Sequence, residues 1–138
     1  MYQYQLSFGE AVKRCFSKYC CFTGRAARSE YWWWYLFTNI IGMVSAIPYY
    51  VMVIPQIISG NADVSSWPLS IVYIVGLAFF LPSLGVTVRR LHDIGKGGGW
   101  IFVALIPVIG AIWLLVLLCQ PSLQGANRFG EEPNMRAY

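Results

Sequence analysis

The sequence predicts an all-α integral membrane protein with three transmembrane helices, preceded by a short amphipathic helix at the membrane surface. Of the 138 residues, 57% are hydrophobic and only 12% are charged, against about 25% charged residues in a soluble domain. The few charges are unevenly placed, because residues 67–88 and 100–123 contain none. Uncharged apolar runs of about 20 residues match the roughly 30 Å thickness of the bilayer core. Backbone amides in lipid must bond internally, so each run is expected to be helical.

The segment before the first apolar run predicts a short interfacial helix over residues 7–20. Ser7 and Glu10 fit the S-x-x-E capping box, in which two side chains satisfy free amides at a helix start. Apolar residues then recur at helical spacing with basic residues between them, which is typical of a helix lying on a membrane with its basic groups toward lipid headgroups. The alternative is that this helix packs on its own protein as a soluble cap.

The ends of the uncharged runs place the three expected spans at residues 31–55, 67–88 and 100–119. The first span opens with a cluster of tyrosines and three consecutive tryptophans, which favour the headgroup zone. Pro82 interrupts the second span, so a neighbouring helix, hydroxyl or water must satisfy the freed carbonyl. The third run, with Pro107 and Gly110 near its centre, is just long enough to cross. It could instead turn back as a re-entrant hairpin.

The positions of lysine and arginine predict the orientation. Five basic residues precede the first span, none lies in the loop at residues 59–66, and three lie at residues 89–99. Because basic segments near span ends stay in the cytoplasm, the N-terminus and the 89–99 loop are expected there. With three crossings, the polar tail at residues 120–138 would lie outside. We therefore expect residues 1–138 to form a single multi-pass domain in a bacterial inner membrane.

Three polar stretches separate the apolar runs. They read F-T-G-R-A-A-R-S-E-Y-W-W from Phe22, L-P-S-L-G-V-T-V-R-R-L-H-D-I-G-K from Leu81, and N-R-F-G from Asn127. With the turn at residues 106–110, and in this order, they resemble the domain-of-unknown-function family 805, the YhaH/YhaI-like small bacterial inner-membrane proteins. The resemblance covers the chain from about Phe22 to Pro133 and departs at residues 97–100, where the family typically reads Ser-Gly-Trp-Trp. It implies a membrane helix bundle and no established activity.

Charged residues of the first two stretches should meet in one layer at the cytoplasmic edge of the spans. Opposite charges confined to a thin layer tend to pair, so we expect contacts of Glu30 with Arg89 or Arg90, and of Asp93 with Arg25 or Arg28. Partly desolvated pairs of this kind fix helix register more than they add stability. The residues expected to form this structural polar layer are Glu30, His92, Asp93, Asn127 and Arg128.

The functional hypothesis for the same layer is a site for an anion or a lipid headgroup. Arginine forks match phosphate geometry, and basic clusters just inside a span favour anionic headgroups. The candidate binding residues are Arg25, Arg28, Arg89, Arg90 and Lys96.

The sequence predicts no catalytic site, metal site or cofactor. His92 and Asp93 are adjacent, and adjacent residues rarely place their side chains to form a general-base pair. Cysteines 15, 20 and 21 lack a second pair of metal ligands. We expect a non-enzymatic accessory protein that binds anionic membrane lipids or a membrane-protein partner, and no nucleic acid. The alternative is a subunit of a homo-oligomeric channel or transporter, for which small residues on the second span offer a helix interface.

Overall fold

The structure, a computed structural model, describes residues 2–60 and 66–136. These form two compact units. The first unit, which we call the polar cap, comprises Met1–Tyr35 and Pro82–Tyr138. The second, the apolar unit, comprises Leu36–Leu81. Asp63, the one charged residue of the sequence between residues 31 and 88, lies outside the described residues.

Helix α1 spans Phe8–Ser17 and confirms the helix expected near the N-terminus. The capping box is present, since the Ser7 amide donates to Glu10 Oε2 at 2.9 Å and the Glu10 amide donates to Ser7 Oγ at 3.4 Å. The Phe8 and Phe16 rings make edge-on contacts with two tryptophans of the next helix at 5.7 and 5.2 Å. Helix α1 therefore packs against the start of that helix, while both phenylalanine rings remain about 40% exposed.

Two helices are long and apolar enough to cross a membrane in the part of the chain that the structure describes. The first is continuous over Arg28–Ile58, comprising α2 (Arg28–Pro48), the π-helical turn η1 (Tyr49–Val53) and α3 (Ile54–Ile58). The second is α4, Trp67–Asp93, which contains Pro82. At 1.5 Å per residue, the 27 residues of α4 extend about 40 Å, more than the roughly 30 Å of the bilayer core. The first two expected spans are therefore helices of spanning length.

The third apolar run does not form the single span expected over residues 100–119. A 3-10 helix, η2, covers Gly98–Leu105, and after a reversal α5 covers Ile109–Cys119. The two pack so closely that a Cβ added to Gly110 would lie 1.8 Å from the Val103 carbonyl oxygen. Helix α5 has 11 residues, which extend about 16 Å and cannot cross the bilayer core alone. The run is a helical hairpin, the alternative left open by its central proline and glycine.

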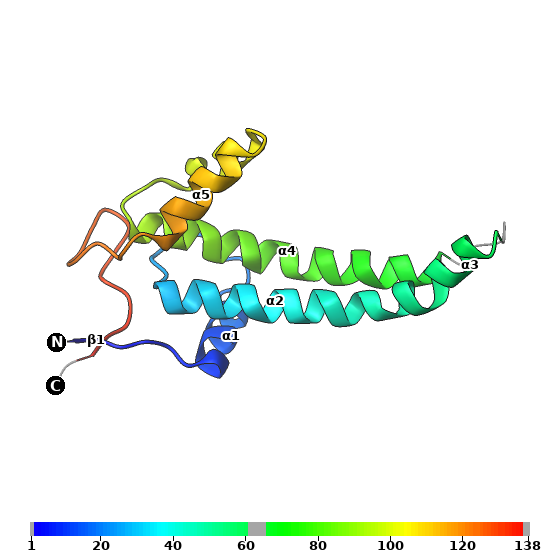
Figure 1. The fold of residues 1–138 in the computed structure, drawn as a ribbon. Helices are drawn as coiled ribbons and strands as arrows, with labels where there is room; N and C mark the ends of the chain where they lie inside the picture. The colour runs from blue at the N-terminus through cyan, green and yellow to red at the C-terminus, as the bar shows by residue number, and fades with distance from the viewer. Residues whose placement is uncertain (1, 61–65, 137–138) are drawn as a thin grey trace. The chain divides into compact units, whose positions relative to one another are not determined.

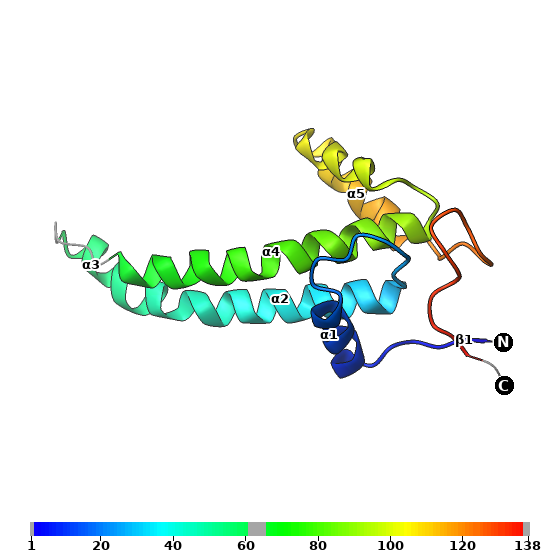
Figure 2. The ribbon, with the colours of Figure 1, turned by 180° about the vertical axis from the view of Figure 1, so that it is seen from behind.

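The C-terminal tail folds back onto the polar cap. Strand β2 (Met135–Arg136) pairs antiparallel with β1 (Tyr2–Gln3), so the two ends of the chain lie side by side in both views (Figure 1; Figure 2). Earlier in the tail, the Leu123 amide donates to the Asp93 carbonyl at the end of α4. The tail therefore lies with the N-terminal segment. This corrects the expectation that three crossings would separate them.

Candidate functional site

The most unusual feature of the polar cap is a set of charged side chains in its interior. Five are buried almost completely: Arg25, Glu30, Arg89, Arg90 and Asp93. We call them the charged core. They come from the loop before α2, the first turn of α2 and the last turns of α4. Because an ion is costly to remove from water, a buried charge is normally paired with an opposite charge.

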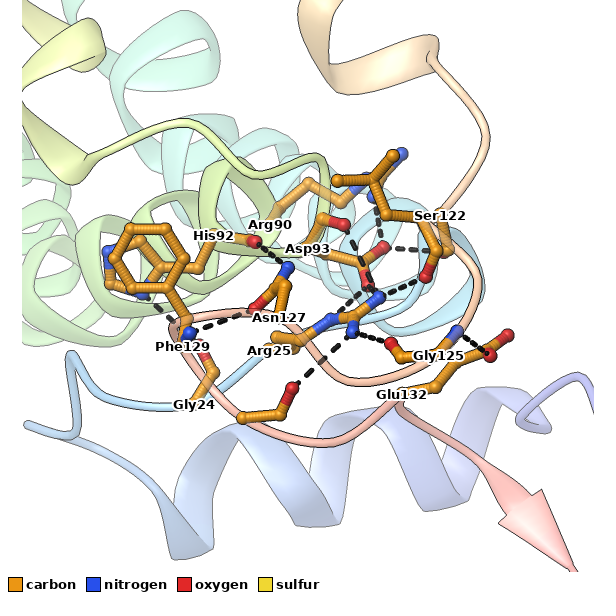
Figure 3. A network of polar contacts seen from close by, with 12 residues as sticks. Gly24, Arg25, Arg90, His92, Asp93, Ser122, Gly125, Asn127, Phe129 and Glu132 are labelled. Atoms are coloured by element: carbon orange, nitrogen blue, oxygen red, sulfur yellow. Dashed lines mark hydrogen bonds and ion pairs between the residues drawn. The ribbon is translucent and has the colours of Figure 1, made fainter.

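Asp93 is the centre of the larger of two groups in the charged core (Figure 3). Arg25 Nε donates to Asp93 Oδ1 at 3.0 Å, while Arg90 Nη1 and Ser122 Oγ donate to Oδ2. Arg90 Nε also donates to the Leu118 carbonyl at 3.1 Å. Other N–H groups of the two arginines donate hydrogen bonds to backbone carbonyls of the tail. These carbonyls belong to residues 120, 123, 125 and 130. One carboxylate thus binds two arginines, and the hydrogen bonds of these arginines hold the tail against the end of α4.

Glu30 is the centre of the smaller group. Arg89 Nη1 lies 2.9 Å from Glu30 Oε1, and Arg14 Nη1 lies 3.7 Å from Oε2. The Arg89–Glu30 contact lacks hydrogen-bond geometry, so attraction between charges holds it. Cys15 lies beside this pair, its sulfur 4.0 Å from Glu30 Oε1. Burial, and then the Glu30 charge, raises the pKa of Cys15 to about 12, so this thiol stays protonated at neutral pH.

The N-R-F-G motif wraps around the end of α4 beside the charged core. The His92 ring stacks on Phe129 with centroids 3.9 Å apart, and His92 Nδ1 lies 3.2 Å from the Gly24 carbonyl (Figure 3). Asn127 Nδ2 donates to the His92 carbonyl at 2.9 Å. Arg128 lies over the Phe129 ring, 4.6 Å from its centroid. These contacts hold the motif against α4 and give His92 a position fixed by the backbone and by stacking.

Of the ion pairs that the sequence left open for each acid, the structure contains Glu30 with Arg89 rather than Arg90, and Asp93 with Arg25 rather than Arg28. The structure adds Arg90 to Asp93 and Arg14 to Glu30. Sequence reasoning missed Arg14, Ser122 and Asn134. Arg14 Nη1 donates to Asn134 Oδ1, which links α1 to the tail. No spacing in the sequence indicates the contacts of these three residues, because their partners are 16 to 120 residues away in the chain.

The five candidate anion-binding residues divide into two groups. Arg25, Arg89 and Arg90 are buried, with their guanidinium groups bound to carboxylates and carbonyls of the protein. Arg28 is exposed, and Lys96 is half-buried with its ammonium 5.0 Å from the Trp100 ring centroid. The residues that face outward are therefore Arg28 and Lys96. The other three build the interior.

A cavity of about 550 Å³ lies beside the charged core. Three segments line it: the first turns of α2 (Arg28, Ser29, Trp32), the N-terminal segment (Tyr4, Gln5), and the end of α5 with the tail (Cys119, Ser122). The N-terminal wall is held in place because the Leu6 amide donates to Ser29 Oγ at 3.1 Å and Trp33 Nε1 donates to the Leu6 carbonyl at 3.0 Å. Within residues 2–60 and 66–136, no three His, Cys, Asp or Glu side chains are placed to hold a metal ion.

Two helices of spanning length and composition, with few of their residues buried within the chain, are typical of a helical membrane protein. The chain belongs to the family described as protein of unknown function DUF805, which it matches over residues 19–131. It is 40% identical over 115 residues to the inner membrane protein YhaI of Escherichia coli strain K12, covering 83% of this chain and 87% of YhaI. It is 35% identical over 121 residues to the inner membrane protein YhaH of the same strain, covering 85% and 90%. No solved structure matches the chain.

Proposed function

We propose that this protein is a non-enzymatic accessory protein of the bacterial inner membrane, whose polar cap binds anionic lipid and whose long helices contact a membrane-protein partner. The observation that carries the proposal is the segregation of charge. All ten lysines and arginines of the sequence belong to the polar cap, together with five of the six acidic residues. Two of those five acids are in the charged core and bound to arginines. The outer surface of the cap is therefore basic.

The same segregation supports a cytoplasmic polar cap. Basic segments next to membrane spans stay in the cytoplasm, and the cytoplasmic leaflet carries anionic lipids that attract such segments by about 1 kcal/mol per basic residue. In this topology the first two helices cross the membrane and the η2–α5 hairpin enters from the cap side and returns. Both termini then lie in the cytoplasm, in agreement with the pairing of β1 with β2.

The apolar surfaces of the two long helices support a membrane-protein partner. In the most apolar stretch of Arg28–Ile58, only 6% of the residues are buried within the chain. The corresponding share for α4 is 17%. Lipid or another helix must cover what remains in a membrane. A small accessory subunit would use part of this surface for its partner and leave the rest to lipid.

The ion pairs of the charged core support a non-enzymatic role. A general acid or base must reach the proton it transfers and exchange that proton with substrate or water. Glu30 and Asp93 are fully buried and already bound by arginines, while His92 is stacked on Phe129. These contacts suit residues that hold the cap together.

Native mass spectrometry of the protein released gently from its own membrane tests this proposal. Co-release of anionic phospholipid together with a second membrane protein at fixed stoichiometry is the expected result. Release of a bare monomer, with no preference for anionic over zwitterionic lipid, would refute it.

An oligomeric channel or transporter subunit is the second candidate function, and a groove in the apolar unit favours it. This groove of about 400 Å³ is lined by residues that include Thr38, Asn39, Gly42 and Ala46 of α2. Small residues allow another helix to approach closely, and polar groups within a span mark pathways in membrane proteins. A homo-oligomer of fixed size without a foreign subunit, in the same mass spectra, would favour this candidate over the accessory role.

A further inference from the structure

We propose that the cavity at the start of α2 binds the phosphate group of an anionic phospholipid, with Arg28 as its cationic ligand. The inference rests on the proposed function, since it assigns the lipid affinity of the polar cap to one site. It also makes a narrower claim. Binding is expected to depend on one arginine rather than on the summed charge of the cap.

The cavity has the size and lining of a headgroup site. Its volume of about 550 Å³ falls within the range of roughly 300–1,000 Å³ typical of small-molecule pockets. Ser29 supplies a hydroxyl, which accepts from the Leu6 amide and keeps its own proton to donate, and Gln5 supplies an amide. Hydroxyl and amide groups of this kind hydrogen-bond phosphate oxygens and the polar part of a headgroup.

Arg28 differs from the other arginines of this region in being available. Arg25, Arg89 and Arg90 are buried and each lies within 3.0 Å of a carboxylate oxygen. Arg28 is exposed, and it makes no ion pair with any acidic side chain of residues 4–60 and 66–134. Its guanidinium fork therefore keeps the geometry that binds two phosphate oxygens at once.

The surroundings of the cavity add positive potential. Ser122 both lines the cavity and donates to Asp93, so the larger group of the charged core lies directly behind this wall. That group holds two arginines against one carboxylate, which leaves one net positive charge. Arg28 also opens α2, and the first amides of a helix carry a partial positive charge. An anion is therefore the favoured ligand.

The apolar edge of the cavity favours a lipid over a soluble phosphate. Trp32 lines it and belongs to the cluster of tyrosines and tryptophans that opens α2, and such rings settle at the headgroup level of a bilayer. Cys119, also in the lining, is the last residue of α5, the apolar helix of the hairpin. A phospholipid can place its phosphate at Arg28 while its acyl chains follow these apolar elements.

The test compares three variants of the full chain by native mass spectrometry in detergent, titrated with phosphatidylglycerol or phosphatidylcholine. Arg28→Gln removes the charge and should weaken phosphatidylglycerol binding by about tenfold or more, the effect of losing a charge-assisted hydrogen bond. Arg28→Lys keeps the charge without the fork and should lose less. Lys13→Gln is the matched control, because Lys13 is an exposed basic residue of α1 outside the cavity lining, and it should change binding less than about twofold. Equal thermal stability of the three variants checks that each is folded.

The outcomes separate this inference from the proposed function. Equal loss in Arg28→Gln and Lys13→Gln, or loss in neither, overturns the cavity site. If the wild type still prefers phosphatidylglycerol in that case, the polar cap binds anionic lipid through diffuse charge and the proposed function stands. A wild type with no preference overturns both. Titration with sn-glycerol 3-phosphate distinguishes the source of the phosphate: comparable, Arg28-dependent affinity for this soluble probe would overturn the assignment to lipid.

Discussion

Asp93→Asn is the substitution that should damage the polar cap most for the smallest change in shape. The carboxylate accepts hydrogen bonds from Arg25, Arg90 and Ser122 and is fully buried. An asparagine there leaves two buried guanidinium groups without a counter-charge and turns an amide donor toward other donors. Removing one partner of a buried ion pair costs about 3–5 kcal/mol. This is a large part of the roughly 5–15 kcal/mol that stabilises a typical domain.

The assay is equilibrium unfolding in mixed micelles with increasing SDS, followed by tryptophan fluorescence. Glu131→Gln is the control, since Glu131 is an exposed acid of the same tail, and it should change the free energy of unfolding by less than about 0.5 kcal/mol. Replacing Arg90 by Met in the Asp93→Asn background should restore part of the loss, because one uncompensated charge is removed with it. A loss below about 1 kcal/mol for Asp93→Asn would refute the view that this carboxylate organises the cap.

Two further predictions concern the hairpin and the cysteines. Gly110→Ala should open the hairpin and lower the thermal stability, because the added methyl group would meet the Val103 carbonyl. Gly76→Ala is the control and should not lower it, since the space around Gly76 is open. Similar melting temperatures for the two variants would contradict the close packing of η2 on α5. Maleimide at pH 7.5 should modify Cys21 at least about a hundredfold faster than Cys15, because hydrogen bonds to a neighbouring threonine lower the pKa of the first and burial raises that of the second to about 12. Mass spectrometry of the labelled peptides measures the two rates, and equal rates would show that Cys15 is accessible.

Local sequence signals predicted much of the fold. The capping box at Ser7 fixed the start of α1 within one residue, and the uncharged runs located the two long helices. These features depend on residues close together in the chain, where helix capping and hydropathy act directly. Helix α4 continues five residues past the expected end at Val88, because ion pairs within the cap compensate the charges of its last turns.

The hairpin was harder to predict, because hydropathy measures how apolar a run is and not whether its chain reverses. Residues 100–119 have the length and composition of a span. The reversal depends on Pro107, on the positive φ of Val108, and on Gly110, whose missing side chain lets η2 and α5 touch. A proline and a glycine so close together signal a turn, but the sequence alone left a crossing helix and a hairpin both open.

The ion pairs of the candidate site were predictable from the sequence, but the burial of its arginines was not. Two ion pairs followed from the confinement of opposite charges to one layer. Burial of Arg25 and Arg90 depends on the tail, whose carbonyls and Ser122 cover their guanidinium groups and Asp93. Because the tail was expected on the other side of the membrane, the sequence could not separate the buried arginines from the available Arg28.

The most direct test of the shared cytoplasmic cap is to measure on which side of the membrane the tail lies. In a variant without the four native cysteines, single cysteines replace Gln124 in the tail, Lys13 in α1 or Ser66 before α4, all exposed positions. A membrane-impermeant maleimide is then added to intact spheroplasts and to permeabilised ones. Positions 124 and 13 are expected to react only after permeabilisation, while position 66 is expected to react in intact spheroplasts. Labelling of position 124 in intact spheroplasts would show that the third apolar run crosses the membrane and would contradict the shared cytoplasmic cap.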